Sequence, residues 1–259
     1  MKKFYYLMSL FIFAGFISCK NENKKTEDSS TNVPVAVSSE TTPEYKKINV
    51  KKVEANPNDM QSVSRLLDET EKHDIDVVNW PDQYPSKPEV SFSIAHNGDN
   101  ILLKYFVHEN EILGNVTQDN GEVWTDSAVE FFLMFGNDYY YNAEFNCIGT
   151  ALLGHKATGD NDIEHASPEI MKSIKRLASL GTEKRNKETG DFHWTLTVAI
   201  PKTAYWQDSI DTFSGLKALG NFFKCGDNLT TPHYLSWTEI DTPNPSFHQP
   251  DFFGELEFE

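Results

Sequence analysis

Hydrophobic and polar residues alternate over much of this chain, with the period of two that is typical of β-strands. The clearest pattern spans residues 123–135 and 139–146, two runs separated by the turn residues 136–138. From residue 129 onward, the odd-numbered positions are almost all apolar or aromatic. We therefore expect a hairpin with one face in the core and one mixed face that can bind a ligand. The mixed face would carry Trp124, Asp126, Glu130, Asn142, Glu144 and Asn146.

The register of this hairpin follows from its turn. A three-residue turn keeps odd positions opposite odd positions, whereas a two-residue turn would bring Phe145 to the face of Glu130 and bury polar groups. The hydrophobic pattern selects the three-residue turn, which places Glu130 directly opposite Glu144. Because like charges opposed across a sheet are unfavourable, the pair indicates a hydroxyl-rich ligand, a cation or a raised pKa.

Similar alternating runs predict further strands, separated by turns that contain Gly, Pro and Asn. Two helices are expected, residues 59–70 capped by Asn58 and residues 168–180 with Pro168 in the first turn and Gly181 after the end. Many short strands with one or two short peripheral helices predict an all-β fold, an antiparallel, jelly-roll-like β-sandwich. The other expected strands are residues 45–53, 90–96, 101–108, 148–155, 192–200, 217–225, 234–240 and 253–258.

The start of the chain has the pattern of an export signal. Two lysines precede an apolar stretch, residues 4–17, that is too short to span a bilayer. Ser18 and Cys19 then form a loose lipobox, the signal for lipidation at the cysteine, although an ordinary signal peptide with a chance cysteine is the alternative. We expect an exported outer-membrane lipoprotein that faces the periplasm or the cell surface. Its parts would be a signal peptide over residues 1–18, the lipidated Cys19 with a disordered tether over residues 19–44, and one domain over residues 45–259.

Charge and cysteine content narrow the range of partners. The net charge of −16 argues against nucleic acid and against acidic lipids as partners, and it is compatible with neutral ligands or calcium.

Cys147 and Cys225 either form one disulfide or remain as two buried thiols. An acidic loop offers hard oxygen ligands for a structural calcium ion, or is simply solvated. Its acidic residues are Asp160, Asp162 and Glu164.

Four stretches together resemble the family 9 carbohydrate-binding modules and their lipoprotein relatives from Bacteroidetes. They are Ile75-Asp76 with Trp80; the strands VSFSIAH and ILLKYFVHE; VWTDSAVEFFLMF with YYYNAEFNCIGT; and NFFKCGDNLTTPHYLSW with FHQPDFFGELEFE. The resemblance implies a β-sandwich that binds glucan or xylan oligosaccharides, often at chain ends, between two Trp rings. It implies that Trp124 and Trp237 are those rings and that Glu130 accepts hydrogen bonds from sugar hydroxyls. The chain departs from the family pattern at Asp76-Val77, where Asp-Gly is usual.

The leading hypothesis is non-catalytic carbohydrate binding by a membrane-anchored lipoprotein, in polysaccharide capture or degradation, with no catalytic residue. Two alternatives remain: a glycoside hydrolase that uses Glu130 and Glu144, and a haem-binding redox module with Met134 and His155 or His233 as axial ligands. His233 and His248 are otherwise expected to be structural. The predicted ligand-binding residues are Trp124, Asp126, Glu130, Asn142, Glu144, Asn146 and Trp237.

Overall fold

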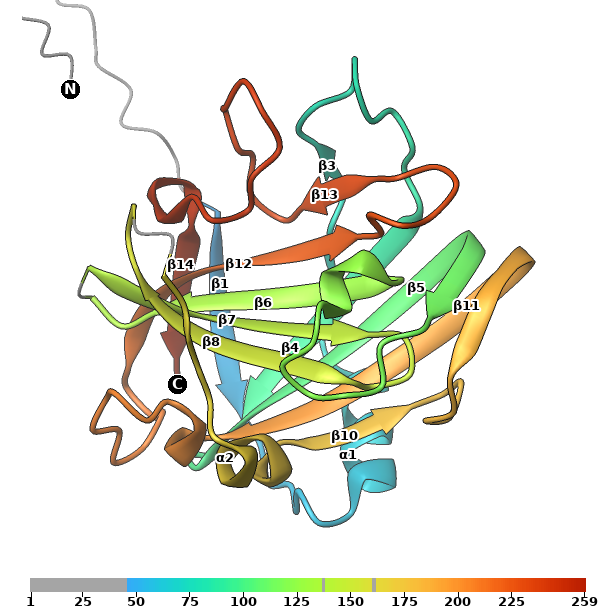
Figure 1. Cartoon of the computed structure of the whole chain (residues 1–259). Helices are drawn as coiled ribbons and strands as arrows, with labels where there is room; N and C mark the ends of the chain where they lie inside the picture. The colour runs from blue at the N-terminus through green and yellow to red at the C-terminus, as the bar shows by residue number, and fades with distance from the viewer. Residues whose placement is uncertain (1–45, 137, 160–161) are drawn as a thin grey trace, which may run out of the picture. The chain divides into compact units, whose positions relative to one another are not determined.

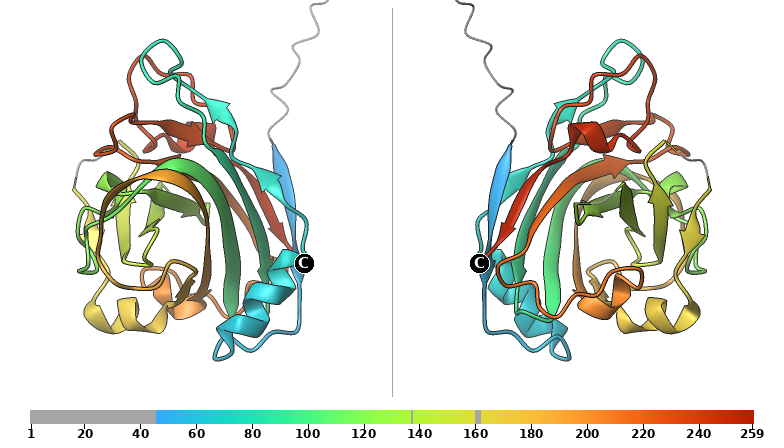
Figure 2. Two further views of the ribbon diagram at one scale, coloured as in Figure 1. Left: turned by 90° about the vertical axis from the view of Figure 1, so that its right-hand side faces the viewer. Right: turned by 90° about the vertical axis from the view of Figure 1, so that its left-hand side faces the viewer.

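The strands of the domain form two packed layers (Figures 1 and 2). The computed structural model describes residues 46–136, 138–159 and 162–259. The expectations for residues 1–45, including Cys19, lie outside the described residues. The first layer contains β3 (Val77–Val78), β6 (Ala128–Met134), β7 (Tyr139–Asn146), β8 (Ala151–Ala157), β9 (Glu164–His165), β12 (Lys217–Cys225), β13 (Tyr234–Ser236) and β14 (Gly254–Phe258). The second layer contains β2 (His73–Asp74), β4 (Glu89–His96), β5 (Asn100–Gly114), β10 (Lys175–Ala178) and β11 (Arg185–Pro201).

One strand, β1 (Lys47–Lys52), joins the two layers. Its first residues pair in parallel with β14, and Lys51 and Lys52 pair in parallel with β4. The other strand pairings of the described residues are antiparallel. The all-β sandwich expected from the alternating pattern is therefore confirmed, with β1 as its parallel element.

The core between the layers is rich in aromatic rings. Phe92 from β4 stacks on Phe222 from β12 with ring centroids 3.6 Å apart, and the edge of Trp237 packs against both rings. The Trp237 side chain is 4% exposed. A Cβ at Gly254 would lie 2.5 Å from this indole, so only glycine fits beside it. This packing explains the Phe-Gly-Glu-Leu ending of the sequence.

The prediction that Trp237 stacks on a sugar is wrong. That role came from the family resemblance, whereas the alternation puts Trp237 on the face of Leu235, and both side chains are buried in the core. The backbone amide of Trp237 then donates to the carbonyl of Phe222, and its indole turns into the core.

A second apolar cluster covers part of the outer face of the first layer, the face turned away from the second layer. Phe132 and Tyr140 stand at even positions of the central hairpin and are fully buried. Residues from the C-terminal segment, among them Phe247 and Phe253, pack over them together with Trp80. The mixed face of the hairpin is therefore open only where this cover ends.

The two helices are shorter than the sequence predicts. In α1 (Met60–Asp68), Asp59 is the N-cap in place of Asn58, since its carboxylate accepts from the Ser62 amide. Its apolar side packs on the second layer. The α2 helix (Pro168–Ser173) ends well before Gly181, because residues 175–178 pair with β11 as an edge strand. Neither helix in the described ranges is long and apolar enough to cross a membrane.

Two departures in the strands matter for function. The first run of the hairpin opens as a 3-10 turn, η1 (Val123–Thr125), and its strand begins only at Ala128. Both β5 and β11 extend well beyond the predicted strands, and they curve side by side as a long pair (Figure 2). Two further 3-10 turns are η2 (Lys202–Ala204) and η3 (Pro250–Phe252).

The core position of Trp237 can be tested by truncation. We expect Trp237→Ala to lower the free energy of unfolding by about 3–5 kcal/mol, measured by urea denaturation, because the deletion leaves a cavity among the central rings. The exposed Tyr139→Ala should change it by less than about 1 kcal/mol. Equal stability of Trp237→Ala and the wild type would contradict the packing described above.

Candidate functional site

A pocket of about 380 Å³ opens on the outer face of the first layer, beside the second apolar cluster. We call it the outer-face pocket. It combines aromatic side chains with carboxyl, amide and imidazole groups, the mixture that orients a polar ligand in an otherwise apolar site. The aromatic members are Trp124, Tyr234 and Phe247, and the polar members are Glu130, Asn142, Glu144, His165, Asp227 and His248.

The floor of this pocket is the hairpin of β6 and β7. Glu130 lies directly opposite Glu144 in the ladder, so the predicted register is confirmed. Asn142 precedes Glu144 by two residues and therefore shares its face. On the neighbouring strand, Gly154 pairs with Asn142, and a Cβ there would lie 2.4 Å from the Asn142 amide oxygen. A glycine at this position thus leaves room for the amide.

The hydrogen bonds of the floor leave two acceptors unused. Oε1 of Glu144 accepts from Nδ2 of Asn142 at 2.8 Å, and Oε1 of Glu130 accepts from the Cys225 thiol at 3.0 Å. Among the described residues, Oε2 of Glu144 and Oδ1 of Asn142 have no partner although both atoms are buried. Because a buried polar atom without a partner is costly, these two oxygens indicate that a ligand or solvent donates to them.

Burial changes the protonation of the two opposed carboxyl groups. It raises the pKa of Glu130 well above its usual value, with the charge of Glu144 as a further cause. Burial also raises the pKa of Glu144 to about 7. The pair can therefore hold a proton near neutral pH, so that one carboxyl donates while the other accepts. A neutral hydroxyl group, which both donates and accepts, suits such a pair.

The walls of the pocket come from distant parts of the chain. Trp124 is half-buried on η1, and its carbonyl accepts weakly from the Asp227 amide at 3.5 Å. Asp227 bonds through its side chain to Tyr234, and burial raises the pKa of the Asp227 carboxyl. His248 contacts the hydroxyl of Tyr140 at 2.8 Å through Nδ1. Burial lowers the pKa of His248 to about 4, so its imidazole is neutral at pH 7.

Two predicted ligand-binding residues have a structural role. Oδ2 of Asp126 accepts from the amides of Asn115 and Val116 at 2.9 Å and from Nδ2 of Asn146 at 2.8 Å. Both Asp126 and Asn146 are buried and lie outside the outer-face pocket. Asp126 precedes β6, which begins at Ala128, and it binds the loop at residues 115–116. Asn146 ends β7, and its amide donates to Asp126 and to the carbonyl of Val116.

The remaining candidates are placed as follows. Cys147 and Cys225 are free buried thiols. His233 is buried with Nε2 at 2.9 Å from the Lys224 amine, as a structural histidine. His248, which was also expected to be structural, lines the pocket.

The structure adds no support for the predicted calcium site in the acidic loop. Asp160 lies outside the described residues, and Glu164 accepts hydrogen bonds from Trp206 and Gln207. The calcium ion stays a prediction.

Sequence reasoning assigned no role to Asp227, Tyr234 or Phe247. Asp227 and Phe247 stand in the loops that follow β12 and β13, where no alternation marks the direction of a side chain, and Tyr234 is the first residue of the short strand β13. The only signal was a cluster of aromatic and polar residues over residues 226–248.

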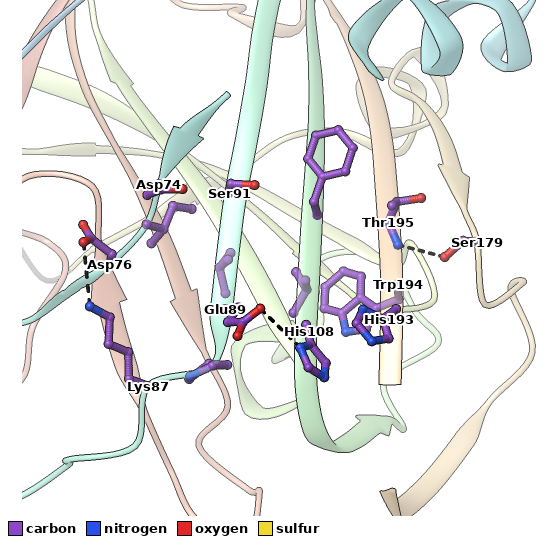
Figure 3. A pocket seen from close by; sticks show the side chains of 15 residues that line it. Asp74, Asp76, Lys87, Glu89, Ser91, His108, Ser179, His193, Trp194 and Thr195 are labelled. Atoms are coloured by element: carbon purple, nitrogen blue, oxygen red, sulfur yellow. Dashed lines mark hydrogen bonds and ion pairs between the residues drawn. The ribbon is translucent and has the colours of Figure 1, made fainter. Parts of the chain in front are cut away.

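A larger cavity of about 720 Å³ lies on the second layer, between β2, β4, β5 and the middle of β11 (Figure 3). We call it the second-layer cavity. Charged side chains on its lining pair with one another, Asp76 with Lys87 and Glu89 with His108. Among the described residues, no buried side-chain oxygen or nitrogen on this lining lacks a partner. The outer-face pocket is therefore the better candidate for a hydroxyl-rich ligand.

Comparisons with known proteins identify the family of the chain. The model of a family described as carbohydrate-binding family 9 matches residues 61–258. The crystal structure of a proposed carbohydrate-binding protein from Bacteroides uniformis is 44% identical, with a TM-score of 0.80, over 83% of this chain and 100% of that chain. A search of curated proteins returned no match.

Two structures of a family 9 module from Caldicellulosiruptor kristjanssonii are more distant, each 12% identical over 83% of this chain. The complex with glucose has a TM-score of 0.48 over 96% of that chain. The complex with cellotriose has a TM-score of 0.49 over 94% of that chain.

The buried carboxyl pair makes stability depend on pH. Because the pKa of Glu144 is raised from its usual 4.5 to about 7 in the folded protein, the folded protein holds this proton more tightly than the unfolded chain does. The contribution of protonated Glu144 to the free energy of unfolding is present below about pH 4.5 and is lost as pH rises toward 7. Between pH 4.5 and 8, we expect the free energy of unfolding of Glu144→Gln to rise by roughly 1–3 kcal/mol relative to that of the wild type, as measured by urea unfolding. The exposed Glu183→Gln should follow wild type, and parallel curves for Glu144→Gln and wild type would refute the assignment.

Proposed function

The chain belongs to carbohydrate-binding family 9, and on that premise we propose that its outer-face pocket binds an oligo- or polysaccharide without cleaving it. The observation that carries this proposal is that the half-buried indole of Trp124 shares the pocket with two buried acceptors, on Glu144 and Asn142, that have no partner among the described residues. Sugars offer the matching groups, because a pyranose ring has an apolar C–H face and a rim of hydroxyl donors.

Each part of the pocket has a role in this binding. The flat face of Trp124 would stack on the sugar ring. Hydroxyl groups at the rim of the sugar would donate to Oε2 of Glu144 and Oδ1 of Asn142, and Glu130 and Asp227 lie within the same lining. The volume of about 380 Å³ is at the small end of ligand pockets. We therefore expect it to hold the end or a short stretch of a glycan, not a long chain.

The sugar class is inferred from the family resemblance, which favours glucan- or xylan-type oligosaccharides. The net charge of −16 fits a neutral glycan better than an acidic one. A glycan array of neutral and acidic polysaccharides would identify the ligand.

A glycoside hydrolase is the second candidate, because Glu130 and Glu144 are opposed. Hydrolysis requires the two carboxyl groups to stand on either side of the glycosidic bond. Directly opposed strand positions place their Cβ atoms about 4.5–5.5 Å apart, which leaves little space for a glycosidic oxygen between them. We therefore favour binding alone. Release of reducing sugar from a bound glycan, lost in Glu130→Gln, would establish hydrolysis instead.

We further propose that the protein is a lipoprotein anchored at Cys19 and held by its tether at the outer membrane, on the periplasmic or the outer face. The support is the sequence alone: a basic start, a short apolar stretch and a cysteine followed by a polar tract. An anchored binding module would hold glycans near the cell for uptake or degradation.

Truncation of the stacking ring tests the site. We expect Trp124→Ala to weaken oligosaccharide binding by about 2 kcal/mol or more, about thirtyfold in affinity, measured by calorimetry. The matched control is Tyr139→Ala, which removes an exposed aromatic side chain from the same hairpin outside the pocket. Unchanged affinity in Trp124→Ala, with a normal thermal melt, would rule out this pocket as the binding site.

Substitution of the proposed anchor tests the localisation. We expect Cys19→Ser to move the protein from the detergent phase to the aqueous phase in detergent partitioning and to abolish labelling with radioactive palmitate. Cys147→Ala should keep both properties, because that thiol is buried in the domain. Retention of Cys19→Ser in the detergent phase would show that another segment anchors the protein.

A further inference from the structure

Two histidines and two carboxylates lie close together at the edge of the second-layer cavity. His108 on β5 and His193 on β11 are directly opposite in the ladder, and Glu89 on β4 is opposite His108. Asp191 precedes His193 by two residues, and its carboxylate contacts the His108 ring. Figure 3 shows the His108 and His193 rings side by side, with Glu89 reaching His108.

The geometry points to a site for one divalent transition-metal ion of the zinc class, with His108, His193 and Asp191 as ligands; we propose this as a second site, independent of sugar binding. One ligand atom from each of these three residues lies within 4.8 Å of the others. Two nitrogen ligands and one carboxylate, with further positions left for water, form a set that zinc commonly uses.

The individual distances fit a metal centre after small side-chain movements. Nε2 of His108 lies 2.6 Å from Oδ1 of Asp191, and Nε2 of His193 lies 3.9 Å from the same oxygen. With bonds of about 2.0–2.2 Å, ligand atoms around tetrahedral zinc are separated by roughly 3.4 Å, which falls between these two values. His193 and Asp191 are exposed, so their side chains can make this adjustment.

Glu89 has the position of a residue that orients a ligand. Its Oε2 lies 3.3 Å from Nδ1 of His108, the ring nitrogen opposite to the one that faces Asp191. A carboxylate that accepts from the second nitrogen of a metal-bound histidine fixes the tautomer and the ring orientation. With zinc bound, Glu89 would hold the proton on Nδ1 of His108, so that Nε2 binds the ion instead of donating to Asp191.

The fold explains why the ligands converge. The pairing of β11 with β5 shifts register between Thr189 and Phe192, so Asp191 falls on an irregularity of the strand. Such irregularities redirect a side chain out of the regular ladder. The rings of His108 and His193 stack at 3.9 Å with an interplanar angle of 15°, so the exposed His193 ring has to turn for its lone pair to meet that of His108 at one ion.

The chemistry of the ligands selects the class of ion. Imidazole nitrogens favour zinc, copper and nickel over calcium, which takes six to eight oxygen ligands. Because the two histidines also line the cavity of about 720 Å³, an ion there could take a water molecule or a small ligand as a further partner. The alternative is an ion-pair network in which a protonated His108 bridges Glu89 and Asp191 without metal.

Zinc titration decides between the two. The full chain, without a histidine tag and treated with a chelator, is titrated with zinc chloride at pH 7.5 by calorimetry. We expect one zinc per chain, and at least about tenfold weaker binding in His193→Gln and in Asp191→Asn. Glu89→Gln should weaken zinc binding by about tenfold or more through its effect on His108. Calcium in excess should not displace the zinc.

The matched control is Asp76→Asn, the same change at an exposed carboxylate of the same cavity outside the cluster, which should bind zinc as the wild type does. Thermal melts check that each variant is folded. The proposal is overturned if the wild type takes up no zinc at millimolar concentration, or if His193→Gln and Asp191→Asn bind it with wild-type affinity. Neither result would bear on sugar binding, which is measured separately at the outer-face pocket.

Discussion

The opposition of Glu130 and Glu144 across two paired strands is the constraint on which the outer-face pocket depends. Two carboxyl groups are buried side by side, where like charges and lost hydration both act against ionisation. The surroundings offset part of this cost, since the Cys225 thiol donates to one carboxyl and the Asn142 amide donates to the other. Among the described residues, Oε2 of Glu144 and Oδ1 of Asn142 remain without a partner, and both residues line the pocket. A ligand with hydroxyl groups can complete the arrangement.

The separation of the two faces of the first layer makes this pocket possible. Odd positions of the hairpin enter the aromatic core and fix the strands, so even positions are held in place without taking part in that core. The C-terminal segment covers part of the even face with apolar rings and supplies Phe247 and His248 to the pocket wall. A binding surface is thereby built on rigid strands, with only its walls formed by loops.

The sequence predicted what depends on local periodicity. The sandwich, the register of the hairpin and the grouping of Glu130, Asn142 and Glu144 follow from alternation within two adjacent strands. Trp124 lines the same pocket, but it stands on a 3-10 turn and not on the strand, so the odd–even alternation does not account for its position. Asp126 was misplaced because β6 begins only at Ala128. Trp237 was misplaced by the family resemblance, although its alternation with Leu235 already allowed a core position. The long extensions of β5 and β11, which bring His108 to His193, depend on tertiary pairing that no short window of sequence records.

The most direct measurement is a crystal structure of the protein with a neutral oligosaccharide identified by the glycan array. We expect a sugar ring stacked on Trp124, with hydroxyl groups at hydrogen-bond distance from Oε2 of Glu144 and Oδ1 of Asn142. A sugar bound elsewhere, for example in the second-layer cavity, with those two oxygens still without a sugar partner, would contradict the central claim.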